Sequence, residues 1–245
     1  MNLYNEDCMK ILPTLKDSSV DLVVIDPPYD IPNITPGSQS TLSKSFERSL
    51  KQLDDAKIIS SYDIVSVNTE LVRIMRGINI YIWCNKKQIP EYFDFYVNNL
   101  QCKFEILCWH KTNVLPAYNC KYLTDTEYCL YFHKDGYGAQ PSCYEDAQTF
   151  YIAPSNVNDK KYYKHPTIKP LVIIERLIRN SSKPGDIVLD CFMGSGTTGV
   201  ACKDLNRNFI GIEISKEWYD IAYDRITLGS ATIDTSESLD FSGLE

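Results

Sequence analysis

Short apolar runs alternate with helical segments along this chain, and that alternation limits the folds it can adopt. The clearest runs are VDLVVI (residues 20–25), INIYIWC (78–84), DIVLD (186–190) and NFIGIEI (208–214). They are rich in β-branched residues and nearly continuous in apolar character, which is typical of strands buried on both faces. Segments with a helical period separate them. This order predicts an α/β protein whose doubly wound, mostly parallel sheet carries helices on both sides.

The rest of the chain fits the same scheme, apart from three segments. Further strands are expected at residues 3–7, 103–109 and 126–133, the last two as antiparallel neighbours, and helices at residues 8–15, 54–75, 90–99, 171–180, 197–205 and 215–228. Gly77 is the expected stop of the second helix. Residues 31–42 read as a loop. Residues 134–168 lose the pattern, so we interpret residues 134–168 as a small recognition insert. One domain over residues 1–230 and a loose acidic tail at 231–245 complete the expected organisation.

Composition narrows the class of protein. A chain of 245 residues that is 44% hydrophobic can bury a large core, and the absence of an apolar run of about 18 residues or a signal peptide predicts a cytoplasmic protein without a membrane span. Nine cysteines without a CxxC pair predict neither a metal site nor a disulfide. The net charge of −7 disfavours nucleic acid as a partner, but residues 151–185 hold seven Lys or Arg against two acids, so a locally basic face is possible.

The run at residues 20–25 ends in Asp-Pro-Pro-Tyr, which we call the catalytic corner, residues 26–29. Two consecutive prolines fix the backbone and remove two N–H donors. An acid at the end of a buried strand needs polar partners, which makes Asp26 a poor choice for structure alone. Asp26 is therefore the first candidate functional residue.

A second corner follows the strand at residues 186–190. The stretch LDCFMGSGTTG places Gly194 and Gly196 before a helix, where backbone can approach a ligand and free N–H groups are exposed. Glu213 ends the next strand, where an acid can accept hydrogen bonds from ribose hydroxyls. These features predict a nucleoside pocket.

Two other classes of protein can use such a glycine turn. With Gly199 the turn satisfies G-x-G-x-x-G, the pattern of dinucleotide-dependent oxidoreductases. Too little chain follows residue 186 for the second nucleotide-binding half of such a fold, and the catalytic corner would have no role in it. A non-catalytic nucleotide-binding module is the other alternative.

Four motifs in a fixed order resemble the amino-group DNA methyltransferases that use S-adenosylmethionine, in the permuted group with the catalytic motif first and the cofactor motif last. They are DPPY (residues 26–29), WHKTNVLP (109–116) followed by TEYCLYF, HPTIKP (165–170) and LDCFMGSGTT (189–198); the opening NEDCMKILPTL is also similar to the family's lead-in. The resemblance implies an open, doubly wound sheet of seven strands, one of them antiparallel, of the Rossmann-like methyltransferase type. It also implies that both corners lie at the carboxyl ends of neighbouring central strands.

The resemblance assigns roles to single residues. The catalytic residues would be Asp26, Pro27, Pro28 and Tyr29, and those for S-adenosylmethionine would be Asp7, Thr167, Lys169, Asp190, Phe192, Gly194, Gly196, Thr197, Thr198 and Glu213. Among these, Asp7 would lie near the adenine of the cofactor, and Thr167 with Lys169 around its methionine part. Plainer interpretations stay open: a helix start at Lys169, an acid that steadies the glycine turn at Asp190, core residues at Trp83 and Trp109, and a structural His165.

The implied reaction is methyl transfer to an exocyclic amino group of a base. Asp26 would accept one amino hydrogen and the Pro27 carbonyl the other, Tyr29 would stack on the base, and residues 31–42 would close over a base rotated out of the duplex. An acid at the first motif position favours adenine; the cytosine amino group and RNA adenine remain alternatives. Asn at the first motif position would favour a methyltransferase that acts on protein glutamine. The sequence contains no Pro-Cys dipeptide, which disfavours methylation at carbon 5 of cytosine. Expected partners are double-stranded DNA with a short site, a second copy of the chain and a restriction endonuclease.

Overall fold

The computed structural model describes residues 1–28, 63–114, 122–155, 163 and 168–228. The strands are β1 (Asn2–Asn5), β2 (Leu22–Ile25), β3 (Asn79–Cys84), β4 (Lys103–Lys111), β5 (Thr126–His133), β6 (Phe150–Ala153), β7 (Ile187–Asp190) and β8 (Asn208–Glu213). The helices are α1 (Cys8–Ile11), α3 (Ile64–Ile74), α4 (Ile89–Phe93), α5 (Tyr144–Ala147), α7 (Leu171–Ser181), α8 (Thr197–Asp204) and α9 (Lys216–Leu228). A short turn η1 (Leu12–Thr14) extends α1, and a wider π-helical turn η2 (Asp94–Asn99) extends α4.

The described strands form one sheet in the order β1-β8-β7-β2-β3-β5-β4-β6. β5 runs antiparallel to both of its neighbours, and every other pair is parallel. The mostly parallel α/β sheet with one antiparallel strand is therefore confirmed, and so is the antiparallel pairing of β4 with β5. The sheet has eight strands where seven were expected. The additional strand, β6, lies in the segment predicted as an insert and pairs with the outer edge of β4.

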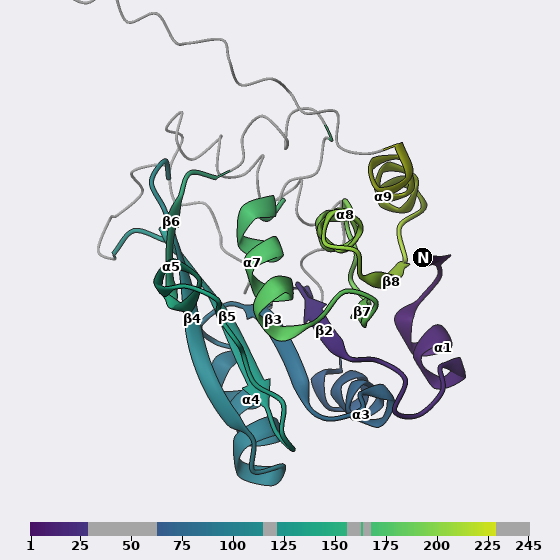
Figure 1. The fold of residues 1–245 in the computed structure, drawn as a ribbon, viewed down its shortest axis with the longest axis horizontal. Coiled ribbons are helices and arrows are strands. Elements are labelled where there is room, and N and C mark those ends of the chain that lie inside the picture. The colour runs from purple at the N-terminus through teal and green to yellow at the C-terminus, as the bar shows by residue number, and fades with distance from the viewer. Residues whose placement is uncertain (29–62, 115–121, 156–162, 164–167, 229–245) are drawn as a thin grey trace, which may run out of the picture.

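Helices cover both faces of the sheet, as a doubly wound fold requires (Figure 1). α1, α3 and α4 with its η2 extension pack on one face, where Leu71 and Tyr96 are fully buried. α7, α8 and α9 pack on the other face around Leu177 and Ile226. The apolar residues of β2 alternate between these two cores, which explains why its sequence reads as continuous apolar character.

Local chemistry fixes the start of α3. The Asp63 side chain accepts the Ser66 N–H at 3.0 Å, and Asp63 itself has an extended backbone. Of the helix expected over residues 54–75, the structure shows the part from Ile64 to Ile74, with Asp63 as its N-cap residue, and residues 54–62 lie outside the described residues. Gly77 is not the helix stop, since α3 ends at Ile74. A Cβ on Gly77 would lie 2.4 Å from the Tyr137 ring, so close packing explains this glycine.

Membrane-spanning helices, metal clusters and disulfides can be assessed only in the described part of the chain. No helix there is long and apolar enough to cross a membrane. No cluster of three or more His, Cys, Asp or Glu side chains in these ranges could hold a metal ion, and the eight described cysteines are free thiols. The predicted loop at residues 31–42 and the predicted tail at 231–245 lie outside the described residues.

Candidate active site

The two corners found in the sequence meet at one edge of the sheet. β2 pairs with β7 in parallel, with Leu22 opposite Val188 and Val23 opposite Leu189. Asp26 follows the last residue of β2, and Asp190 is the last residue of β7. Carboxyl ends of parallel strands are where doubly wound sheets bind ligands. The sheet therefore places the catalytic corner beside the glycine turn.

Lys169 lies against Asp26. Its ammonium forms an ion pair and hydrogen bond with Asp26 Oδ2, although the two residues are 143 positions apart in the sequence. The Lys169 side chain is only 6% exposed, and that of Asp26 is 24% exposed. Lys169 directly precedes Pro170, the N-cap residue of α7. The start of α7 thus delivers a buried positive charge to the acid of the catalytic corner.

A second acid, Glu127 of β5, continues this contact. Lys169 Nζ lies 3.2 Å from Glu127 Oε2, and Lys111 at the end of β4 forms an ion pair with Glu127 Oε1. Burial alone would raise the pKa of Glu127, but the charges of Lys169 and Lys111 lower it to about 2. Burial likewise opposes the charge on Lys169, and the carboxylates of Asp26 and Glu127 raise its pKa. The result is an alternating chain of charges, which we call the ion-pair chain: Asp26, Lys169, Glu127 and Lys111.

Two tryptophan rings border the ion-pair chain. Lys169 Nζ lies 5.1 Å from the centroid of the Trp83 ring, and Lys111 Nζ lies 5.1 Å from that of Trp109. An ammonium over an aromatic face is attracted by the ring electrons. Both tryptophans are buried. The interpretation of Trp83 and Trp109 as core residues is confirmed, and their faces also contact the buried cations.

The backbone of the catalytic corner has its own brace. Gln88 Nε2 donates to the Pro28 carbonyl at 3.1 Å. Gln88 is buried and lies at the N-cap position of α4, just after β3. Pro27 is buried as well. Gln88 thus holds the second proline of the corner from the neighbouring strand.

Asp190 organises the glycine turn. Its Oδ1 accepts the Phe192 N–H at 3.0 Å, and its Oδ2 accepts the Thr198 hydroxyl at 2.7 Å. Burial raises the pKa of Asp190 to about 7, and the negative charges of Asp26 and Glu213 contribute in the same direction. The interpretation of Asp190 as an acid that steadies the turn therefore fits the structure.

Glu213 holds the same turn from β8. Its Oε2 accepts the Gly194 N–H at 2.8 Å and its Oε1 the Ser215 N–H at 2.8 Å. Gly194 has φ 52° and Gly196 φ 81°, a left-handed conformation that favours glycine. Burial raises the pKa of Glu213, although the two N–H donors lower it. A carboxylate has about four acceptor positions, so Glu213 can bind the turn and still accept a hydroxyl.

Arg225 of α9 is a site residue that the sequence interpretation missed. Its Nη1 donates to the Ser195 carbonyl at 3.2 Å, to the Ser195 hydroxyl at 3.2 Å and to the Thr197 hydroxyl at 2.9 Å. The Tyr163 ring centroid lies 4.6 Å from its guanidinium carbon. Arg225 is 4% exposed. A buried cation thus fastens the glycine turn to α9.

The remaining predicted site residues divide into two groups. Asp7 follows β1 and caps α1 by accepting the Met9 N–H at 2.8 Å. β1 pairs with β8, with Asn5 opposite Glu213, so Asp7 lies at the same edge as the glycine turn. Tyr29, Thr167 and His165 lie outside the described residues.

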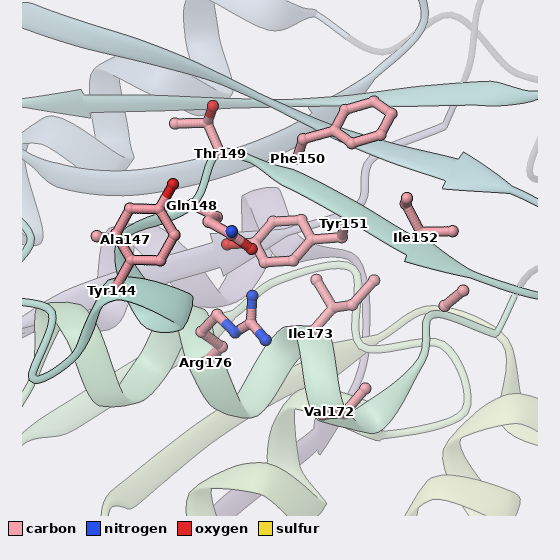
Figure 2. Close-up of a pocket in the computed structure, with 11 residues that line it drawn as sticks. Tyr144, Ala147, Gln148, Thr149, Phe150, Tyr151, Ile152, Val172, Ile173 and Arg176 are labelled. Atoms are coloured by element: carbon pink, nitrogen blue, oxygen red, sulfur yellow. The ribbon is translucent and has the colours of Figure 1, made fainter.

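A cavity of about 690 Å³ lies between β6 and α7 (Figure 2). The Arg176 guanidinium lies 4.9 Å from the centroid of the Tyr151 ring on one wall of this cavity. Tyr144, Phe150 and Ile152 on its rim are at least half exposed. None of the residues that line it belongs to the catalytic corner or the glycine turn.

Taken together, the carboxyl ends of β2, β7 and β8 carry three acids around a glycine turn. This edge is where doubly wound α/β sheets bind ligands, and the acid and prolines of the catalytic corner lie beside the glycine turn there. Comparison with known proteins identifies the family. The family model described as DNA methylase matches residues 20–224, and the chain belongs to this N6/N4 DNA methylase family.

Individual relatives are similar to this chain over almost its whole length. The chain is 32% identical to "Type II methyltransferase M2.LlaDCHI" of Lactococcus lactis subsp. cremoris, over 93% of this chain and 90% of that protein. It is also 32% identical to "Type II methyltransferase M2.DpnII" of Streptococcus pneumoniae, over 95% and 91%. The crystal structure of the M1.HpyAVI-SAM complex is 28% identical with a TM-score of 0.65, covering 91% of this chain and 98% of that one.

Proposed function

We propose that this chain transfers the methyl group of S-adenosylmethionine to the exocyclic amino nitrogen of adenine in DNA. The observation that carries the proposal is the position of Asp26, at the end of a central strand and directly beside the glycine turn. Membership of the DNA methylase family supports the reaction class. The SAM complex of the similar M1.HpyAVI supports the cofactor.

The residues at the glycine turn fit this cofactor. Gly194 and Gly196 have left-handed backbones, and neither glycine has a side chain to cover the turn. A Cβ on Gly196 would lie 3.0 Å from Ala222. Glu213 has acceptor capacity for ribose hydroxyls. In the proposal the turn holds the nucleoside part, and Asp7 lies on the adenine side. Bound S-adenosylmethionine supplies an electrophilic methyl group on a positively charged sulfur.

The catalytic corner prepares the amino group. The amino nitrogen of a base is a weak nucleophile because its lone pair is delocalised into the ring. Asp26 accepts one amino hydrogen and the Pro27 carbonyl the other, which turns the lone pair towards the methyl group. Positive charge develops on the nitrogen during transfer, and a fixed carboxylate stabilises that charge. Tyr29 is assigned to stacking on the base.

Lys169 receives a different role from the one implied by the family resemblance. The structure brings its ammonium to Asp26 and Glu127, so we assign it to positioning Asp26 rather than to binding the methionine part of the cofactor. The Gln88 contact positions Pro28 in the same way. Both contacts come from outside the corner, and together they hold it in one geometry before substrate arrives.

Adenine is the proposed base because the motif begins with an acid at Asp26. The amino groups of cytosine and of RNA adenine present the same planar hydrogens, so the corner alone does not exclude them. The 16% identical PvuII DNA methyltransferase, described as cytosine-N4-specific, shares only the fold, with a TM-score of 0.67. The product base therefore decides between these substrates.

The experiment uses the whole chain. Purified protein is incubated with duplex DNA and S-adenosylmethionine that carries a tritiated methyl group, and the DNA is digested to nucleosides. We expect label in N6-methyladenine. Label in N4-methylcytosine, or label only when RNA replaces DNA, would overturn the substrate assignment. The absence of label from nucleic acid, together with binding of a nicotinamide cofactor by the protein, would overturn the reaction class.

The proposal extends to organisation and partners. We assign residues 1–230 to one domain and residues 134–168 within it to target recognition. We also propose that the protein lies in the cytoplasm. The exposed side chains of Tyr144, Phe150 and Ile152 around the cavity of Figure 2 support a contact role for that segment. A companion restriction endonuclease is also proposed, because the relatives carry the name Type II methyltransferase. A homodimer is proposed from the family resemblance alone. Light scattering of the purified chain tests the homodimer.

A further inference from the structure

The loop at residues 85–88 lies beside the catalytic corner. It follows β3, which pairs with β2 in parallel, with Ile82 opposite Ile25. Asp26 directly follows β2, and β3 ends at Cys84, so the two strands end next to each other at the same edge of the sheet. Gln88 closes the loop and donates to the Pro28 carbonyl at 3.1 Å. The loop is thus attached to the corner that would hold the target base.

Short hydrogen bonds fix the backbone of this loop. Asn85 Oδ1 accepts the Lys87 N–H at 2.8 Å and the Gln88 N–H at 3.3 Å. Gln88 Oε1 accepts the Asn85 N–H at 3.2 Å in return. An Asn side chain that bonds the backbone two residues ahead is a turn device. Lys86 and Lys87 therefore project from a backbone that is already ordered.

The charges of Lys86 and Lys87 are not neutralised by the described protein. Both lysines are exposed, and among the described acids none lies within ion-pair distance of either. Lys111 and Lys169 at the same edge differ, because Glu127 and Asp26 pair with them. The exposed positive charge beside the corner therefore belongs to the loop.

We propose that residues 85–88 form a contact surface for DNA backbone phosphates, in which Lys86 and Lys87 bind the strand next to the target nucleotide. This inference rests on the proposed function, because it assumes that DNA is the substrate. The whole chain has a net charge of −7, so binding to a polyanion needs local positive charge. A rigid loop that also holds Pro28 would fix the strand and the catalytic corner relative to each other.

The test compares two double variants with the same loss of charge. Lys86→Ala with Lys87→Ala removes the loop cations. Lys103→Ala with Lys183→Ala is the matched control, since both lysines are exposed and lie at the opposite, amino-terminal edge of the sheet. The affinity for a duplex that the wild type methylates is measured by fluorescence anisotropy over a series of salt concentrations. Binding of S-adenosylmethionine and kcat at saturating DNA are measured alongside.

The expected result is specific to the loop variant. The slope of log affinity against log salt should fall by about 0.9 for each lost phosphate contact, and affinity should fall on the order of tenfold at physiological salt. Cofactor binding and kcat at saturating DNA should stay unchanged, and Lys86→Arg with Lys87→Arg should keep the wild-type slope. A loop variant with the slope and affinity of the control would overturn the proposal.

A second measurement tests the position of the contact. Neutral methylphosphonate linkages beside the methylated base should remove the difference in affinity between the wild type and the loop variant. The same linkages one helical turn away should leave that difference intact, and the reverse pattern would contradict the proposed placement. A wild type that methylates no DNA would instead refute the proposed function, so the two failures are distinguishable.

Discussion

Lys169 contacts Asp26 through an ion pair that is largely shielded from water, and Glu127 contacts the same ammonium from the other side. The pairing is not a route for protons. The pKa of Glu127 is about 2, whereas that of Lys169 is raised above its ordinary value. Transfer of a proton from the ammonium to Glu127 is therefore strongly uphill. We interpret the ion-pair chain as a support that fixes the orientation of the Asp26 carboxylate.

Replacement of Lys169 should reduce kcat more than it affects binding. In Lys169→Met the apolar stem remains, but Asp26 loses its charged partner and its fixed orientation. We expect kcat to fall on the order of a hundredfold, as for the loss of one oriented electrostatic contact, with little change in the Kd for S-adenosylmethionine. Lys169→Arg should recover part of kcat. A large loss of cofactor affinity with unchanged kcat would instead support the methionine-binding role.

Loss of Glu127 should destabilise the fold. Glu127→Gln would leave Lys169 and Lys111 without their shared acid, and breaking a buried ion pair costs several kcal/mol. The Glu127 side chain is 18% exposed, so solvent screening reduces the expected loss to about 2 kcal/mol in urea unfolding. Glu105→Gln on the exposed part of β4 is the control and should change stability by less than about 0.5 kcal/mol. Equal stability of the two variants would contradict the importance of the ion-pair chain.

Asp190 should make stability depend on pH near neutrality. Its folded pKa is about 7, against 3.8 for the unperturbed side chain. Between these values the folded state holds a proton that the unfolded state has released, so this group's contribution to stability falls as pH rises from about 4 to about 7. Asp190→Asn removes that dependence. The Tm of Asp190→Asn relative to wild type should therefore rise between about pH 5 and about pH 8; a constant difference would contradict the raised pKa.

Arg225 should be required for the shape of the cofactor turn. Arg225→Met removes all three hydrogen bonds from Nη1 to Ser195 and Thr197. We expect a loss of stability on the order of 3 kcal/mol and weaker binding of S-adenosylmethionine by calorimetry. Arg76→Met is the control, because Arg76 pairs with Asp21 at the opposite edge of the sheet. Cofactor affinity that falls equally in both variants would show a general effect on folding.

The sequence was sufficient for the positions of both corners. Continuous apolar strands followed by an acid, prolines or glycines have few alternative folds, and Asp26 and Asp190 lie where parallel pairing requires them. β6 was missed because its four residues follow a long stretch of turn residues, where a short strand has no distinct pattern. Its pairing with β4 depends on tertiary context rather than on local sequence.

The supports of the site were harder to predict. Lys169 and Asp26 are 143 positions apart in the sequence, and a single sequence does not indicate which distant residues come into contact. Glu127 did leave a signal, since it is an acid within the apolar strand TEYCLYF. Arg225 left another, because it lies between Ala222 and Ile226 on the buried face of α9. Buried charges in apolar patterns need partners, and that rule would have selected both residues.

The most direct test of the central claim is single-molecule sequencing of DNA from cells that express either the wild type or Asp26→Ala. Calorimetry with S-adenosylmethionine verifies that the purified variant still binds the cofactor, because Asp26 lies outside the glycine turn. We predict N6-methyladenine at one short site in the wild-type DNA and none in the variant DNA. Methylation by Asp26→Ala at a level near that of the wild type would contradict the proposed mechanism.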